Sequence, residues 1–517
     1  MSLLRSIATI GGLTMVSRVL GFARDTLMAA LLGAGPVADA FFVALRFPNL
    51  FRSLFAEGAF SAAFVPIFVG TLTLEGRTRA IVFAEQALAV LTTALFAFIV
   101  LIEIFMPAFI TVLAPGFVGW PTFDLAVEFS RLTFPYLLFI SLTALQGGVL
   151  NSFGRFAAPA ATPILLNLSL ITALLGTGPW MPTMGHALAW GVVLGGIIQF
   201  LWLLHSCGSE GVWLRMPWPR MTPNVRHMLL RALPVAFGAG VYQVNVMAGT
   251  ILASLLPVGS VSYLFYADRL NQLPYGIIGV AVSTALLPLL SRQVRAGEVD
   301  AALASQNRAL EFAIFFMLPA AAALMVLATP IIDVLFRRGA FGPVEVAETA
   351  HALVAFACGL PALMLVKSLT PGFYAREDTR TPVKIAVVSA ALNIGMAALL
   401  MFPMRHVGIA LAASVANWVN ALLLGIVLHR RGFLQFDARL RRRLPRTCVA
   451  TAAMAAVSYG AMRMAQPWLD GPFVERGAAL ALVIAAGLIV FGLSAHLFGA
   501  ASLRELVGLF RRGERPA

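Results

Sequence analysis

The stretch "VSRVLGFARDTLMAALLG", residues 16–33, has the apolar character of a membrane-spanning helix. It nevertheless contains Arg18, Arg24 and Asp25. A charged side chain at the centre of a bilayer costs about 2.5–3.5 kcal/mol on insertion scales, so such residues usually face a helix-bundle interior or a wet cavity. The stretch therefore predicts a transmembrane helix with one face turned toward a polar interior.

The composition of the whole chain is that of an integral membrane protein. Of its 517 residues, 60% are hydrophobic and 12% are charged, and the mean hydropathy is +0.88. Soluble domains are about 45–50% apolar and about 25% charged. The net charge of +14 indicates cytoplasmic loops beside anionic lipid, with no nucleic-acid partner expected.

Fourteen stretches are long and apolar enough to be spans, since roughly 20 residues cross the bilayer core. They lie near 6–33, 37–70, 80–108, 124–150, 159–178, 185–205, 227–256, 260–290, 304–330, 346–370, 382–402, 407–429, 446–465 and 476–499. If the N-terminus is cytoplasmic, the inner loops hold most of the arginines, whereas the first three outer loops contain no Lys or Arg. The positive-inside rule then predicts that both termini are cytoplasmic.

The chain also contains an internal repeat with an offset of about 223 residues. "ADAFFVALRFPNL" (38–50) aligns with "VSYLFYADRLNQL" (261–273), which pairs Arg46 with Arg269. Each copy holds six spans, so both copies run in the same direction across the membrane, as in transporters made of parallel halves. We therefore expect an all-α fold of 14 transmembrane helices, with two pseudo-twofold related six-helix lobes around a central cavity and an extra C-terminal helix pair.

The expected organisation follows from the repeat. It consists of an N-lobe over 1–206, a cytoplasmic linker over 207–226, a C-lobe over 227–430, an interfacial amphipathic helix over 431–445, spans 13 and 14 over 446–500, and a basic cytoplasmic tail over 501–517.

Charged residues gather in the first, second and eighth spans, and arginines outnumber the acids there. An anionic ligand would supply the missing partners, because a guanidinium binds phosphate through two hydrogen bonds. The candidate substrate-binding residues are Arg18, Arg24, Asp39, Asn49, Arg52 and Arg269, and the candidate gating or ion-pair residues are Asp25, Glu57 and Asp268. Structural ion pairing remains the alternative, with Arg24 held by a carboxylate, Arg52 by Glu57 and Arg269 by Asp268.

Several function classes lack their signatures. The sequence has no GxxxxGK[ST] loop and no HExxH motif, and its three cysteines are not spaced as a metal or redox site. We expect a transporter with no cofactor or metal, and not an enzyme. An exporter of cationic drugs would need an acidic cavity, and a non-transporting scaffold would not explain arginines within spans.

The chain resembles the MurJ (MviN) family of bacterial lipid II flippases, within the MOP exporter superfamily. The resemblance is carried by "SRVLGFARD" (17–25), "ADAFFVALRFPNLFRSLFAEGAFSAAFVP" (38–66), "YADRLNQLPYGIIGVAVSTALLP" (266–288) and "KSLTPGFYAREDTRTPVK" (367–384). It implies transport of the undecaprenyl-pyrophosphate-linked peptidoglycan precursor to the outer leaflet of the bacterial cytoplasmic membrane. The family's cavity charges match Arg18, Arg24, Asp39, Arg52 and Arg269, and Asp25 matches the carboxylate beside Arg24.

The resemblance also implies that spans 13 and 14 form a groove for the lipid tail. The expected partners are lipid II, membrane lipids and cell-wall synthesis proteins. Some family members have a sodium site; here Gly249 stands where an Asp would be expected, although Asn393 is present, so no site of that kind is expected. Export of another anionic polyprenyl-linked glycan remains the alternative function.

Overall fold

The computed structural model describes residues 3–51 and 59–500, and every regular element in these ranges is helical. The chain divides into two compact units, Met1–Ser262 with Arg338–Phe341, and Tyr263–Arg337 with Gly342–Ala517. The helices of the first unit are α1 (Leu3–Leu32), α2 (Pro36–Phe51), α3 (Ala59–Leu74), α4 (Arg77–Ile104), α5 (Met106–Leu113), η2 (Pro115–Phe117), α6 (Pro121–Thr133), α7 (Tyr136–Ser152), α8 (Ala157–Thr172), η3 (Ala173–Thr177), η4 (Gly178–Trp180), α9 (Met184–Ser209) and α10 (Pro223–Ser254).

The second unit holds the rest of the helices, apart from the first turn of α11, which belongs to the first unit. They are α11 (Ser260–Arg295), α12 (Val299–Val326), α13 (Ala328–Phe336), α14 (Pro343–Ala357), α15 (Leu360–Tyr374), α16 (Arg380–Arg430), α17 (Ala438–Met464), α18 (Gln466–Leu469) and α19 (Phe473–Leu497).

Eight helical segments of the described chain are long and apolar enough to cross a membrane, which confirms an all-helical membrane protein. One of them, α16, contains two of the predicted spans, because its backbone leaves the helical region at Arg405 (φ 51°), just after Pro403. Five predicted spans are not among the eight, namely those in α1, in α2 with α3, in α10, in α11 and in α17. Of these helices, α1, α11 and α17 carry several charges along their length, which lower their hydropathy. The total of fourteen spans stays a prediction.

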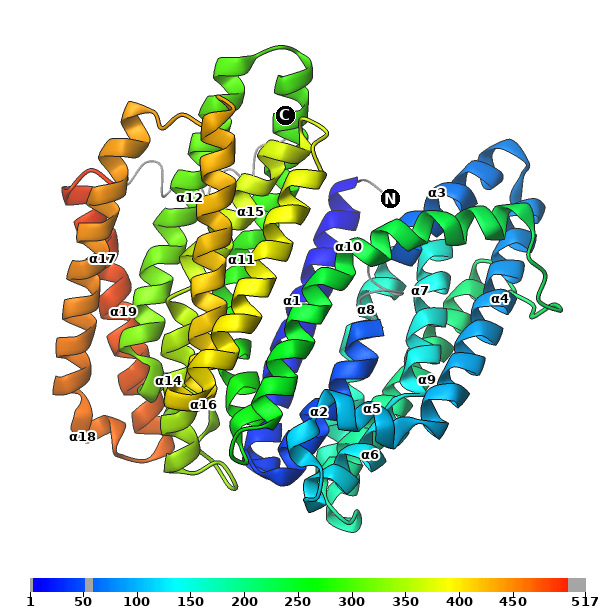
Figure 1. The fold of residues 1–517 in the computed structure, drawn as a ribbon, viewed down its shortest axis with the longest axis horizontal. Coiled ribbons are helices and arrows are strands. Elements are labelled where there is room, and N and C mark those ends of the chain that lie inside the picture. The colour runs from blue at the N-terminus through cyan, green and yellow to red at the C-terminus, as the bar shows by residue number, and fades with distance from the viewer. Residues whose placement is uncertain (1–2, 52–58, 501–517) are drawn as a thin grey trace. The chain divides into compact units, whose positions relative to one another are not determined.

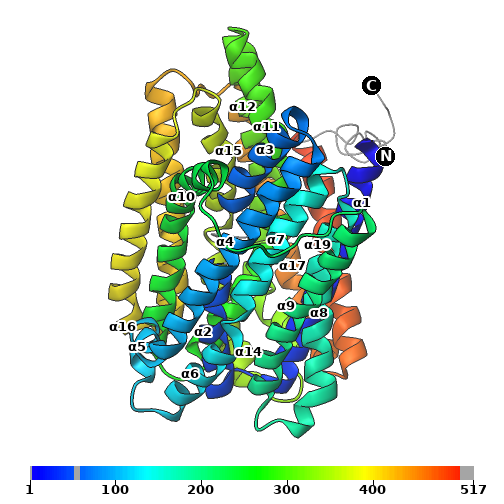
Figure 2. The ribbon, with the colours of Figure 1, turned by 90° about the vertical axis from the view of Figure 1, so that its right-hand side faces the viewer.

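Within the first unit, α1 packs against α8, α8 against α9, and α2 against α6 (Figures 1 and 2). Phenylalanines pack against one another in this unit, both between helices and within one helix. Phe41 of α2 meets Phe129 of α6 edge-on at 6.5 Å between ring centroids, and Phe64 stacks on Phe68 within α3 at 5.5 Å. All four rings are fully or almost fully buried, so apolar packing fixes the α2 helix that bears Asp39.

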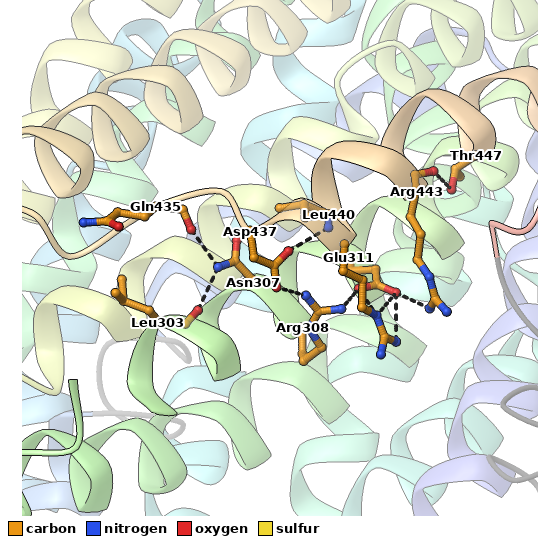
Figure 3. A network of polar contacts seen from close by, with 10 residues as sticks. Leu303, Asn307, Arg308, Glu311, Gln435, Asp437, Leu440, Arg443 and Thr447 are labelled. Atoms are coloured by element: carbon orange, nitrogen blue, oxygen red, sulfur yellow. Dashed lines mark hydrogen bonds and ion pairs between the residues drawn. The ribbon is translucent and has the colours of Figure 1, made fainter. Parts of the chain in front are cut away.

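Within the second unit, α17 lies beside α19 and against α12 (Figure 1). Phe315 of α12, Met454 of α17 and Phe491 of α19 share one apolar cluster. A polar network joins α12 to α17: the Glu311 carboxylate on α12 binds Arg308, Arg439 and Arg443, and Arg308 also binds Asp437 (Figure 3). These contacts attach the C-terminal helix pair to its unit.

The two compact units are divided at different residues from the predicted lobes, and the organisation into lobes stays a prediction. The repeat predicts that residues 227–430 form the C-lobe, whereas α10 packs along α3 and belongs to the first unit. The predicted separate helix over 431–445 also differs from the structure. Asp437 caps a helix that runs on without a break to Met464, and its side chain accepts a hydrogen bond from Leu440 N–H at 2.7 Å. The basic run therefore forms the first turns of α17. The tail 501–517 lies outside the described residues.

The internal repeat reappears in the helix boundaries. α4, α5 and α6 begin at Arg77, Met106 and Pro121, and α12, α13 and α14 begin at Val299, Ala328 and Pro343. Each of these pairs is separated by 222 residues. A break between α6 and α7 is matched by a break between α14 and α15. Because apolar helices resemble each other by chance, these shared boundaries are stronger support for the repeat than the sequence matches.

Two ion pairs occupy equivalent positions in the repeats, and we call them the first tie and the second tie. In the first tie, Arg155 in the turn before α8 binds Glu210 at the end of α9, at 2.9 Å. In the second tie, Asp378 in the turn before α16 binds Arg431 at the end of α16, at 2.6 Å. The positions match at offsets of 223 and 221 residues, but the charges are exchanged.

A buried histidine also recurs in each repeat. The His186 Nε2 lies 3.0 Å from the Glu128 carboxylate and joins α9 to α6. His406 Nε2 lies 3.0 Å from the backbone oxygen of Glu348 and 3.6 Å from its carboxylate, and it joins α16 to α14. Both pairs are separated from their counterparts by 220 residues. The histidines hold equivalent helices together at the opposite end of each repeat from the ties.

Candidate functional site

Arg24 is the best-defined cation of the candidate site. Its Nε and Nη2 donate to one carboxylate oxygen of Asp25, at 3.0 and 2.6 Å, and its Nη1 donates to the Asn167 side-chain oxygen at 2.9 Å. The arginine side chain is 16% exposed and the aspartate side chain 8%. The guanidinium therefore stands in a fixed orientation, and these three bonds leave further N–H groups on it that can bind an anion.

Asn167 on α8 belongs to this cluster, and the sequence reasoning missed it. Its side-chain oxygen accepts the hydrogen bond from Arg24, and its side-chain nitrogen donates to the Ser17 backbone oxygen at 3.0 Å. It thereby ties α8 to α1 at the level of Arg24. A signal was present: Asn167 interrupts the apolar run "PILLNLSLIT" (163–172), and an amide within a span needs a polar partner.

Asp39 has a different environment from the one the sequence suggested. Its carboxylate accepts hydrogen bonds from Gly259 N–H at 2.6 Å, from Ser262 N–H at 2.9 Å and from the Ser262 hydroxyl at 2.6 Å. The residue is 2% exposed. A carboxylate at the N-terminus of a helix satisfies amides that have no partner within the helix. Asp39 thus caps the first turn of α11, and this bonding occupies both of its oxygens.

The other predicted residues of the first unit are placed as follows. Arg18 is exposed on α1, and Asn49 is exposed on α2, one residue after the buried Pro48. Asp25 is buried beside Arg24. Arg52 and Glu57 lie outside the described residues. The structure therefore brings together Arg24 and Asp25, while Asp39 is engaged elsewhere.

In the second unit, Asp268 and Arg269 lie side by side on α11 but have different partners. Asp268 accepts a hydrogen bond from the Gln272 side chain, one turn further along, at 2.5 Å. The Arg269 guanidinium stands over the Phe265 ring, 4.8 Å from its centroid. Both residues are partly exposed. A guanidinium over an aromatic face gains a cation–π attraction from the ring.

A main-chain contact fixes the end of α1 that is nearest to Asp39 in the sequence. Ala340 N–H donates to the Ala30 backbone oxygen at 2.8 Å. Gly33 has φ +67°, and a Cβ there would lie 2.5 Å from the Ala340 backbone oxygen. A Cβ on Gly339 would lie 2.3 Å from the Ala30 oxygen. Glycine is required at both positions because the two backbones touch.

Known proteins similar to this chain point to one family. A probable lipid II flippase MurJ of Rhizobium meliloti (strain 1021) is 43% identical, over 99% of this chain and 97% of that protein. A lipid II flippase MurJ of Burkholderia cenocepacia is 37% identical, over 84% of this chain and 85% of that protein.

Solved structures agree with these relatives. The structure of a lipid II flippase MurJ in an inward closed conformation matches with a TM-score of 0.80 and 26% identity, and it covers 96% of this chain and 99% of its own. An inward-facing multidrug resistance MATE transporter of the MOP superfamily matches with a TM-score of 0.67. This second structure is 14% identical and covers 82% of this chain and 98% of the transporter chain, so the likeness concerns the fold alone.

The family assignment rests on most of the length of the chain. Residues 28–479 match the family described as lipid II flippase MurJ. This range includes Asp39, Asn167 and Arg269. The candidate-site residues of α1 that precede residue 28 lie outside it. The chain belongs to the lipid II flippase MurJ family, and it is a multi-pass membrane protein of that bacterial family.

Proposed function

We propose that this chain, as a lipid II flippase and not an enzyme, carries lipid II across the cytoplasmic membrane by alternating access. In this proposal Arg24 binds the diphosphate of the head group, Arg18, Arg52 and Arg269 are further substrate-binding cations, and the termini lie in the cytoplasm. The observation that carries the proposal is the fixed guanidinium of Arg24, held by Asp25 and Asn167 with N–H groups to spare. A preorganised arginine binds phosphate without first losing side-chain freedom.

Asp39 and Asp25 act as positioning residues in this mechanism. Asp25 orients the guanidinium, and Asp39 holds the first turn of α11, the helix on which Asp268 and Arg269 lie. The polyprenyl tail stays in lipid or along α17 and α19, which correspond to predicted spans 13 and 14. An inside-negative potential favours the return of the empty transporter if its binding residues carry net positive charge, since moving one charge is worth about 2.3 kcal/mol per 100 mV.

The experiment is complementation in bacteria depleted of their own flippase, with lipid II measured in the inner leaflet. The wild-type chain should restore growth and clear the accumulated lipid II, whereas Arg24→Ala should do neither. Arg24→Lys should restore less than wild type, because an ammonium keeps the charge but cannot bind in a fork. The exposed Arg79 of α4 provides a matched control, and Arg79→Ala should complement. Normal clearance by Arg24→Ala would refute the assignment of the diphosphate site.

Asn167→Ala tests whether orientation matters in addition to charge. It removes the Nη1 contact and leaves the arginine and its aspartate in place. We expect reduced clearance of lipid II at normal protein levels in the membrane. If another anionic polyprenyl-linked glycan were the cargo, that glycan would accumulate on depletion and lipid II would not.

A further inference from the structure

The connection between α9 and α10, residues 210–222, is an exposed apolar and basic segment. Trp218 is 82% exposed and Trp213 68% exposed, and Met216 and Met221 are exposed beside them. Arg215 and Arg220 alternate with these side chains and are exposed too. Two tryptophans left in water would be unfavourable, because each has a large apolar surface.

The backbone of residues 213–222 is fastened to α4 at two points. The Arg215 N–H donates to the Glu85 carboxylate at 2.9 Å, and the Arg220 N–H donates to the Gln86 side-chain oxygen at 3.1 Å. The segment has no regular secondary structure. Its position along α4 is therefore set by these two side chains and not by a helix of its own.

The length of α4 fixes the level of that attachment relative to the membrane. From Glu85 to Ile104 the helix rises about 28 Å at roughly 1.5 Å per residue. This is close to the ~30 Å thickness of the hydrocarbon core. After Gln86 the helix contains no charge before Glu103. Glu85 and Gln86 thus stand at one boundary of the hydrocarbon region, and the fastened segment stands there with them.

We propose that residues 213–226 are an interfacial membrane anchor for anionic phospholipid. Trp213 and Trp218 enter the boundary between head groups and acyl chains, where aromatic belts form. Arg215, Arg220 and the exposed Arg226 at the start of α10 bind lipid phosphates, because basic residues are attracted to the anionic surface of a membrane. This anchor holds the stretch that joins the two sequence repeats, and it is independent of the transport route.

Depth measurement by spin labelling tests the aromatic half of the proposal. Cys207, Cys358 and Cys448 are replaced by alanine, and a nitroxide is attached to Trp218→Cys or to Glu75→Cys, an exposed site in the turn before α4. In nanodiscs of phosphatidylcholine and phosphatidylglycerol, the label at 218 should collide more with oxygen than with a water-soluble nickel chelate. The label at 75 should show the reverse. Equal, water-like accessibility at both sites would overturn the proposal.

Lipid retention tests the arginine half. The triple variant Arg215→Gln, Arg220→Gln, Arg226→Gln should keep several-fold less phosphatidylglycerol in native mass spectra than the wild type. A control with three other exposed arginines changed, Arg79→Gln, Arg292→Gln and Arg295→Gln, removes the same charge from elsewhere. Equal loss of lipid in both triple variants would show only a general charge effect, and the proposed lipid site would be wrong.

Discussion

The first and second ties hold the same joint of the two repeats with opposite charges. In the first tie the cation, Arg155, lies in the turn and the anion, Glu210, ends the long helix; in the second tie Asp378 and Arg431 have exchanged these roles. Both repeats therefore connect the turn to the end of the long helix by an ion pair, but either of the two positions can carry the positive charge. A sequence alignment of the repeats would score these positions as mismatches.

The joints differ in what surrounds them. Asp378 also accepts from Thr381 N–H at 3.0 Å and from its hydroxyl at 2.6 Å. The second connection then continues into α17, where Glu311 of α12 receives three arginines. The position equivalent to Glu311 in the first repeat, 222 residues earlier, is the buried Ala89. The second repeat thus has a carboxylate that receives three arginines, whereas the first repeat has an alanine at the equivalent position and connects α4 to the following segment through Glu85 and Gln86.

Removing Glu311 should have the largest effect, because it breaks the feature that only the second repeat has. Glu311→Ala leaves Arg308, Arg439 and Arg443 without their shared carboxylate, which is 13% exposed. Breaking a buried pair costs about 3–5 kcal/mol; since the arginines are 19–47% exposed, we expect a loss of about 2 kcal/mol. The thermal midpoint in nanodiscs measures it. An unchanged midpoint would mean that apolar packing alone holds α17.

Replacing the acidic residue of each tie by alanine should show that the second tie contributes more to stability than the first. Asp378→Ala removes an ion pair and a bond to the first turn of α16, and it should lower the unfolding free energy by about 1–2 kcal/mol. Glu210→Ala removes an exposed pair worth about 0.2–1 kcal/mol. Chemical denaturation of the two variants under the same conditions provides the comparison. Equal losses would show that the contacts of Asp378 with Thr381 add nothing.

Exchanging the two charged residues of each tie should change the stability by a smaller amount and distinguish the two ties further. Arg155→Glu with Glu210→Arg should regain most of the stability lost by Glu210→Arg alone, about 0.2–1 kcal/mol. The corresponding reversal, Asp378→Arg with Arg431→Asp, should not recover, because an arginine cannot accept from Thr381 N–H. Recovery in both ties, read from thermal midpoints, would make the joints equivalent.

The smallest effect concerns pH. Hydrogen bonds from Thr381 and Arg431 hold the pKa of Asp378 well below its usual range. A carboxylate with a lowered pKa contributes its stability above its unfolded pKa of about 3.9, and it loses that stability as the pH falls toward the folded value. The difference in midpoint between wild type and Asp378→Asn should stay constant from pH 7 to 5 and shrink below about pH 4. A difference that changes between pH 7 and 5 would assign the effect to another group.

Much of the fold could be predicted because it depends on periodic and compositional signals. Apolar runs located the helices, and the offset of the repeat returned in the starts of α4 and α12. The sequence could not show that α10 packs on α3, since that depends on the shape of facing surfaces. Nor could it separate an interfacial helix from the first turns of α17, because both have arginines around an apolar face.

For the candidate site, charge within a span was the signal that singled out Arg24 and Asp25, and their part in binding stays a prediction. Charge could not distinguish a ligand-binding carboxylate from a cap, and Asp39 proved to hold main-chain amides more than 200 residues away in sequence. Asn167 was overlooked because it is uncharged. Residue type indicates where polarity is buried, but only the partners decide what that polarity does.

The contact of Ala340 with Ala30 has a consequence for how this chain is studied by mutation. Replacing residues one at a time by alanine reports on side chains, and this contact consists of main-chain atoms between residues that already are alanines. Such a survey would pass over it without a signal, apart from the neighbouring glycines, where the added methyl group collides with backbone. Proline at 340 removes the donor N–H itself. This close backbone contact is therefore detected by substitutions that change the main chain, and not by substitutions that shorten a side chain.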